Sequence, residues 1–544
     1  GGAFNIANCT ISTIAGGVQN TTAFGYTFIG GGSSNSVSGY MSAVVAGFGN
    51  VVSGTDSFIG GGRSNTASGC TSTISGGNSN IANAAYSTVG GGFVVNATGG
   101  RAFAGGGQSN TASGYASVLT GGRASTASGD YAFIGGGSYN TASNSYATIG
   151  GGSNNRALGL QSSVSGGYSN AATNNYSTIS AGYDNTASGG VSSIIGGQNN
   201  TASGAHSKVG GGQSNTASGA CSAIGGGLNN TANNGWTTIA GGVGNTASGY
   251  LATIVGGDGN TASGARSFIG GGVSNTAIGL CSFLGGGNLN CSNAVVTTVS
   301  GGFNNKATII AATVGGGYEN TASAVSALVA GGQASTASGQ RSAIGGGYIN
   351  TASGLYATVA GGYNNIASGT YSAVLGGGSN SATGSYSGAF GCGLTASSAC
   401  TFYANNFCAC GNVMNTGNLT TIKTGGGGTY KQVLVGQTTA AASGTAKKIA
   451  YVGHTHSVRI YVWANQSVGN GSSAIADIAT LYGSSSGGTT VETNFGTTSD
   501  IVITYDNGGS PAYTINVTVV YTGTTPTINY VVEGINNDNS MYTI

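Results

Sequence analysis

The sequence predicts an all-β protein made of a parallel β-solenoid with 15-residue coils, a short neck and a C-terminal antiparallel β-sandwich. Glycine contributes 109 of the 544 residues, and only 4% of the residues are charged. Asparagine recurs every 15 residues from Asn5 to Asn380. Beyond about residue 390 this repeat stops, and non-repetitive segments rich in β-branched residues follow. Low complexity in strict register is typical of a repeat fold, and the change in composition indicates a second domain.

The repeat predicts a rod of 26 coils over residues 1–390, with the consensus N-T-A-S-G-x-x-S-x-I-G-G-G-x-x. Inside each coil the side chains alternate. Asn215 and Ala217 share one face of a short strand, Ser222 and Ile224 share one face of the next, and Cys221 points the opposite way. No insertion or deletion breaks the register, because a slip of one residue would turn every inward side chain outward. Helix is excluded, since each interior glycine costs about 1 kcal/mol relative to alanine.

Stacked coils explain why each repeat copies its neighbour. Parallel strands lie about 4.8 Å apart, so 26 coils form a rod of roughly 120 Å. Isoleucine is then placed on isoleucine in the core and asparagine on asparagine at a turn. An asparagine ladder can form hydrogen bonds along the stack and to its own turn. The alternative is that asparagine merely tolerates the turn backbone.

The column of residues just before the isoleucine is predicted to face outward, yet it is often apolar or threonine. Its members include Phe28, Phe58, Phe103, Phe133, Thr148, Thr178, Phe268, Phe283, Thr298 and Leu328. A thin coil buries little apolar surface. Burial of its one large aliphatic side chain contributes about 1.5–3 kcal/mol of stabilising free energy. We therefore expect this column to be a lateral interface between chains of a homotrimer. The alternative is an ordinary exposed β face.

Two segments, NTASGYASVLTGG (Asn110–Gly122) and NTASGLYATVAGG (Asn350–Gly362), resemble the head repeats of YadA-type trimeric autotransporter adhesins. The resemblance covers residues 1 to about 391, although the repeat of those heads is typically shorter by a single residue. It implies a left-handed parallel β-roll in which three chains pack side by side. Similar repeats occur in tail fibres and surface fibres of viruses, so the resemblance implies a trimeric extracellular rod in either setting.

Residues 391–428 are predicted to form a neck, and residues 429–544 a β-sandwich of seven or eight short strands. The cysteines of the neck match no common zinc spacing. In the C-terminal domain, Trp463, Tyr461, Tyr482 and Arg459 are candidate receptor contacts. The alternative for Trp463 and the tyrosines is a place in the core or in a subunit interface.

The segment Gly453–Ser457, with sequence GHTHS, resembles the His-x-His segments of phage fibre tips. That resemblance implies that His454 and His456 of three chains bind iron at the trimer axis, where six imidazoles suit an octahedral site. The alternative is a pair of exposed strand histidines.

Several classes of function are not expected. The rod carboxylates are spread along the chain and form no pair suited to acid–base catalysis, so we do not expect an enzyme. The net charge of +2 provides no basic stripe for nucleic acid. No segment reaches the roughly 18 consecutive apolar residues of a membrane-spanning helix.

These observations predict a structural fibre of a virus or phage, displayed on the virion surface or otherwise outside the cell. A homotrimeric rod, attached to the virion or another anchoring structure, would present a C-terminal tip that binds a host-cell glycan or protein. The nine cysteines, an odd number, favour free thiols over a disulfide framework. The alternatives are a bacterial cell-surface adhesin and an architectural filament subunit. Receptor binding could instead use the variable residues of the rod at Tyr131, Tyr146, Tyr176 and Trp236.

Overall fold

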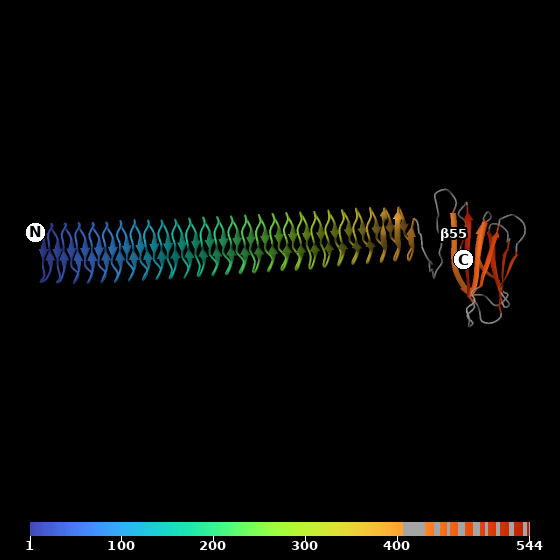
Figure 1. Ribbon diagram of the computed structural model, residues 1–544, viewed down its shortest axis with the longest axis horizontal. Helices are drawn as coiled ribbons and strands as arrows, with labels where there is room; N and C mark the ends of the chain where they lie inside the picture. The colour runs from blue at the N-terminus through green and yellow to red at the C-terminus, as the bar shows by residue number, and fades with distance from the viewer. Residues whose placement is uncertain are drawn as a thin grey trace. The chain divides into compact units, whose positions relative to one another are not determined.

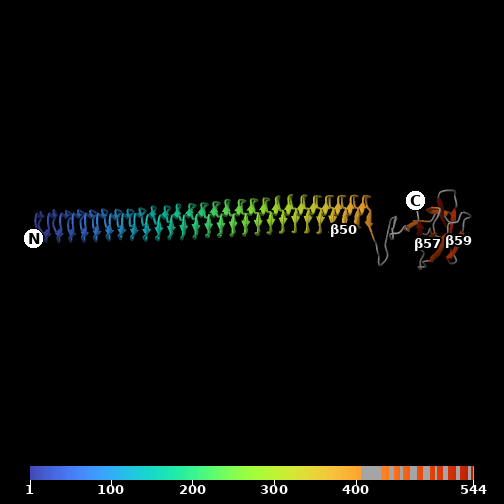
Figure 2. The same ribbon diagram turned by 90° about the horizontal axis from the view of Figure 1, so that it is seen from above.

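The computed structural model describes residues 1–405 in full and, beyond them, the backbone of nine strands between Tyr430 and Tyr542. The two parts form separate units, Gly1–Asn405 and Asn406–Ile544. Figure 1 shows the first unit as a straight stack of short strands running from the N-terminus, and Figure 2 shows the same stack from a second direction. Within the described residues, no helix has the length and apolar character needed to cross a membrane.

The first unit is a parallel β-solenoid, as predicted. Its odd-numbered strands form one 27-stranded sheet, from β1 (Ile6–Ala7) to β53 (Thr395–Ala396), which we call the Thr–Ala sheet. The even-numbered strands form a second ladder, from β2 (Thr13–Ile14) to β54 (Phe402–Ala404), which we call the Ile sheet. All strands from β1 to β49 have two residues, and each pairs in parallel with its equivalent in the next coil, as Thr216 pairs with Thr231.

A third set of contacts closes each coil. Single-residue parallel bridges run from Ala3 to Gly378 and also join equivalent positions of adjacent coils, as Gln213 pairs with Leu228; we call these residues the bridge column. With about 4.8 Å between coils, the 27 coils span about 125 Å. Because each coil is held only by its two neighbours, the fold is quasi-one-dimensional.

The inward-facing side chains agree with the alternation in the sequence. Asn215, Ala217, Ser222 and Ile224 are all buried in one coil, whereas Cys221 is partly exposed. The same four columns are buried along nearly the whole solenoid. The core therefore contains two apolar columns and two polar columns, and the polar ones must find hydrogen-bond partners inside the protein.

The asparagine column finds these partners along the stack. The backbone N–H of Asn230 donates to Asn215 Oδ1 at 3.0 Å, and Asn215 N–H donates to Asn200 Oδ1 at the same distance. The Nδ2 group of Asn215 donates to the carbonyl oxygens of Gly211 and Gly227, both at 2.9 Å. The predicted ladder is confirmed, and the asparagine is fully buried beneath the turn.

Glycine is sterically required at the third position of the Gly-Gly-Gly turn, which Gly212 occupies in the turn at residues 210–212. Gly212 has a φ of +85°, and a Cβ atom there would lie 2.1 Å from the carbonyl oxygen of Gly227 in the next coil. Gly226, at the second position of the turn in the next coil, differs, because no atom lies within 4 Å of the place that its Cβ atom would take. The close spacing of the coils therefore requires glycine at the third position of the Gly-Gly-Gly turn, whereas the second position has room for a side chain.

The solenoid extends one coil beyond residue 390. β50 (Ala373–Gly378) pairs with β52 (Gly388–Cys392), and the register shifts between Val374 and Gly376. Before the shift Ala373 pairs with Gly388, and beyond it the partners lie closer in sequence by a single residue, as in the pairing of Gly388 with Phe402. A turn shortened by that residue accounts for the broken sequence repeat, while the two ladders continue. Part of the segment expected to be a neck is therefore the last coil.

In the second unit the structure describes backbone strands, and it pairs them antiparallel in two sheets, ordered β55-β62-β57-β58 and β59-β60-β61-β56-β63. Their bounds are β55 (Tyr430–Thr439), β56 (Ala446–Gly453), β57 (Ser457–Asn465), β58 (Ala474–Leu481), β59 (Thr490–Phe495), β60 (Ser499–Asp506), β61 (Ala512–Tyr521), β62 (Thr527–Asn536) and β63 (Met541–Tyr542). Whether these sheets pack as a β-sandwich stays a prediction.

Candidate interaction surfaces

The residues predicted to contact a receptor belong to the second unit. Arg459, Tyr461 and Trp463 lie at alternate positions of β57, which pairs with β62 and β58. Tyr482 lies outside the described residues, as do both histidines of the expected iron site, His454 and His456. The receptor site and the iron site therefore stay predictions.

The outward column of the Ile sheet is as apolar as the sequence predicts. Phe28, Phe133 and Phe283 are each about two-fifths exposed, at 40%, 37% and 41%. Phe268 and Phe283 stack with ring centroids 5.3 Å apart. Solitary exposed apolar side chains are common on soluble proteins, but a repeated column of phenylalanine and threonine on one sheet gives a surface on which another chain can pack.

A second column lies at the corner between the two sheets, six residues after each asparagine, and we call it the corner column. It contains Tyr131, Tyr146, Tyr176 and Trp236, which have φ values of 58° or 59°. Such positive φ values are rare for bulky residues. The N–H of Trp236 donates to the carbonyl oxygen of Ala220, in the preceding coil, at 2.8 Å, so the coil closure holds this conformation.

Neighbouring tyrosines of the corner column stack on one another along the rod. The rings of Tyr131 and Tyr146 lie 5.0 Å apart with planes 4° from parallel. Three more, Tyr356, Tyr371 and Tyr386, form a continuous stack with spacings of 4.7 and 4.9 Å. Ring faces in these stacks cover each other, so that edges and hydroxyl groups are left for solvent.

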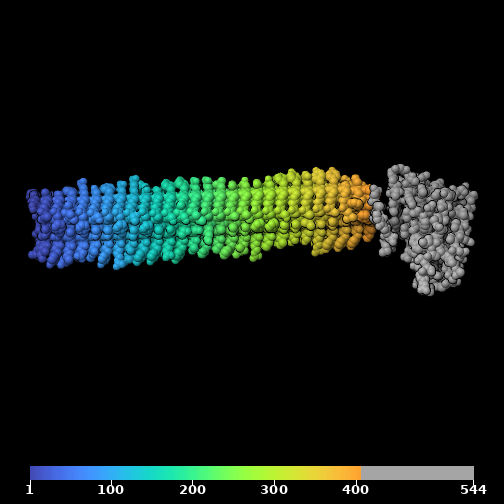
Figure 3. Space-filling model, viewed as in Figure 1, coloured from blue at the N-terminus to red at the C-terminus, as the bar shows by residue number. Residues whose placement is uncertain are grey.

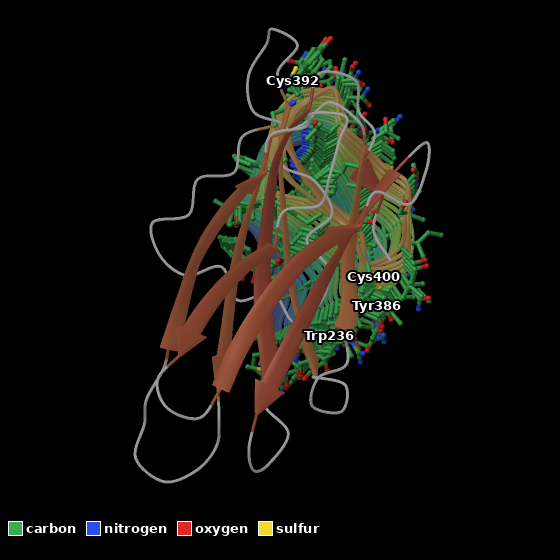
Figure 4. All side chains as sticks on the ribbon, turned by 90° about the vertical axis from the view of Figure 1, so that its right-hand side faces the viewer. Trp236, Tyr386, Cys392 and Cys400 are labelled. Atoms are coloured by element: carbon green, nitrogen blue, oxygen red, sulfur yellow. The ribbon has the colours of Figure 1, made fainter. Side chains whose placement is uncertain are left out.

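The corner column projects from one side of the solenoid. In Figure 4, looking along the rod, Trp236, Tyr386 and Cys400 project from the same side and Cys392 from another. The guanidinium carbon of Arg341 lies 5.3 Å from the ring centroid of Tyr356, which adds a cation at the end of the tyrosine stack. Figure 3 shows that side chains of successive coils align in continuous rows.

The bridge column carries aromatic stacks that the sequence reasoning missed. Tyr168 stacks on Tyr183 at 5.2 Å, and Tyr348 stacks on Tyr363 at 5.6 Å. These residues are also exposed, Tyr363 by 52%. The sequence contained a signal for these stacks, because the two tyrosines of each pair are separated by one full repeat. Residues separated by one repeat occupy equivalent positions on adjacent coils and therefore lie next to each other.

The cysteines within residues 1–405 are free thiols at scattered places on the surface. Burial raises the pKa of the Cys291 thiol, while its hydrogen bond to Asn293 and the charge of Lys306 oppose that effect. Among the described residues, no group of three or more histidine, cysteine or acidic side chains is arranged to hold a metal ion. The described surface therefore offers stacked rings, a phenylalanine column and hydroxyl groups.

No protein-family model matches the chain, and no curated protein is similar to it at a significant level.

Proposed function

We propose that this chain is the structural fibre of a virus or phage, in which a homotrimeric rod presents a C-terminal domain that binds a host-cell glycan. The observation that carries the proposal is the solenoid itself, 27 coils in register that span about 125 Å. A rod of this kind suits a spacer between an anchoring structure and a binding domain. The resemblance to adhesin and fibre repeats supports the same assignment.

The outward phenylalanine and threonine column of the Ile sheet supports the trimer. Lateral packing of three rods would bury side chains such as Phe133 and Phe283, which one chain leaves 37% and 41% exposed. Each phenylalanine that becomes buried contributes at most about 1.5–3 kcal/mol. The low charge of the chain, with 4% charged residues, means that little electrostatic repulsion opposes this packing.

The binding site is assigned to the C-terminal domain rather than to the corner column. Sugar rings pack their apolar faces on aromatic faces and place their hydroxyl groups against polar donors. Tyr131 and Tyr146 cover each other's faces, so they present a poor platform for such stacking. Three copies of a site on Trp463 and its neighbours would add avidity to weak single contacts.

Light scattering of the full chain tests the trimer. The expected mass is three times the chain mass of 52.1 kDa, and a monomer at micromolar concentration would contradict the proposal. Metal analysis of the same sample tests the iron site. If iron binds at His454 and His456, the double alanine variant loses both the metal and part of the thermal stability.

A glycan array probed with the full chain tests the binding site. Trp463→Ala should lose binding at least tenfold, while Trp236→Ala, on the corner column, should bind as the unmodified chain does. The reverse result would move the site to the rod. A trimer that binds neither glycans nor host cells would support the architectural filament instead.

A further inference from the structure

We propose that one face of the Thr–Ala sheet binds the surface of ice. The face covers seven consecutive coils and consists of two outward columns separated by a buried alanine column. We call it the hydroxyl face. Its first column consists of Thr186, Thr201, Thr216, Thr231, Thr246, Thr261 and Thr276. Its second column covers six of the seven coils with Ser188, Ser203, Ser218, Asn233, Ser248 and Ser263, and Ile278 stands at this position in the seventh.

The side-chain hydroxyl groups of this face make no hydrogen bond to any other described residue, although the backbone N–H groups of the same residues are all paired. Thr216 N–H donates to Asn230 O at 2.8 Å, and Ser218 N–H donates to Ala232 O at 2.9 Å. The threonines are half-buried between their neighbours, and the serines are half-buried or exposed. A two-dimensional array of hydroxyl groups is therefore left for water or for an external ligand.

The array is regular in both directions. Along the rod, adjacent threonines are one coil apart, about 4.8 Å, and across the strand the two columns are two residues apart, about 6.7 Å. These distances are close to the two repeats of oxygen atoms on the prism face of hexagonal ice. The backbone bond from each threonine is 2.8 or 2.9 Å long through all seven coils, so the spacing does not drift.

Rigidity suits a solid ligand. Threonine is β-branched, so few χ1 rotamers are accessible within a strand, and each coil is bonded to both neighbours. Each coil would contribute a weak contact, but seven contacts in register on one crystal would act together. A mobile solute could use only a few of them at a time.

The composition of the face also favours ice over a charged or aromatic-binding partner. Neither column holds a charged or aromatic side chain in these seven coils. The charged residues nearest to them in the threonine column are Arg156 before the face and Lys306 after it. The hydroxyl face lies on the sheet opposite the phenylalanine column, so this inference does not rest on the proposed trimer.

The test compares two substitutions in one coil of the full chain. Thr231→Tyr places a bulky side chain in the middle of the hydroxyl face. Leu228→Tyr places the same side chain in the bridge column, where Leu228 is 36% exposed and where Tyr168 and Tyr183 stand in other coils. Tyrosine is favoured in strands, so both variants should fold, which circular dichroism and the melting temperature verify. The measurements are partition into slowly growing ice and the freezing-point depression below the melting point.

We expect the unmodified chain and Leu228→Tyr to partition into ice and to depress the freezing point, and Thr231→Tyr to lose at least nine-tenths of both effects. Exclusion of the unmodified chain from ice would overturn the proposal. Equal activity of the two variants would overturn it as well, because the face would then not be the binding surface. Binding to crystalline chitin without binding to ice would reassign the face to a polysaccharide.

Discussion

Removing one asparagine from the buried ladder should open the solenoid locally. In Asn215→Ala, the backbone N–H of Asn230 loses its acceptor, which now lies at 3.0 Å. The carbonyl oxygen of Gly211 loses the 2.9 Å donor it has in Asn215 Nδ2. The oxygen of Gly227 loses a donor too but keeps the N–H of Gln213 at 2.8 Å.

The expected cost follows from these losses. A buried donor left without a partner costs about 1–3 kcal/mol, and each ordinary hydrogen bond contributes about 1 kcal/mol. We therefore expect Asn215→Ala to destabilise the coil by about 3 kcal/mol. Asn215→Asp should cost more, because a buried carboxylate would face the two carbonyl oxygens that now accept from Nδ2.

The chain contains its own control for this prediction. Ser125 and Ser335 stand in the asparagine column, and their Oγ atoms accept the next backbone N–H at 3.2 Å. Asn215→Ser should therefore preserve the acceptor for Asn230 and cost about half as much as the alanine variant.

Hydrogen exchange read by mass spectrometry on the full chain measures the local effect, since each coil can open separately. A loss of about 3 kcal/mol corresponds to roughly a hundred-fold faster exchange, at about 1.4 kcal/mol for each factor of ten. The acceleration should be confined to the peptides around residues 200–245. Exchange within threefold of the unmodified chain in Asn215→Ala, or equal acceleration in the serine and alanine variants, would refute the role of the ladder.

Three further predictions concern other columns. Gly212→Ala should disrupt its coil, because the new Cβ would lie 2.1 Å from a carbonyl oxygen of the next coil, whereas Gly226→Ala should leave hydrogen exchange unchanged. Ser222 Oγ is buried without a hydrogen-bond partner, so Ser222→Ala should leave the stability of the solenoid unchanged or raise it by up to about 1 kcal/mol. Ser57→Ala removes a 2.7 Å hydrogen bond to the carbonyl oxygen of Gly69 and should lower the stability. The melting temperatures of the two variants test this order. Because burial raises the pKa of Cys291 above its ordinary value, its reaction with iodoacetamide should rise at a higher pH than that of cysteine in a short unstructured peptide, and an equal pH profile would contradict this.

The proposed glycan and iron sites depend on residues outside the fully described part of the chain, so sequence alone supports them. For Trp463, an alternate position in β57 agrees equally with a receptor contact and with a core position. Sequence reasoning could not separate these, because period-two alternation identifies a shared face and not which face is buried.

The amino-acid sequence by itself determined the coil length, the register and the inward columns of the solenoid. In a strict repeat without insertions, only one register places each residue on the equivalent residue of the next coil. The alternation around Asn215 and Ile224 identifies which side chains are buried. These features are local and repeated, so each coil reports them independently.

Only the tertiary structure decided how the corners are built and where the solenoid ends. Tyr131 and Trp236 have φ values of 58° and 59°, which their own preferences disfavour, because coil closure and a bond to the preceding coil impose that conformation. In the last coil, Gly388 and its partner Phe402 are closer in sequence by one residue than the partners in the regular coils. In the sequence alone, this change in spacing looked like the end of the repeat. Backbone hydrogen bonds between coils do not depend on side-chain identity, so the ladder could continue after the sequence pattern had stopped.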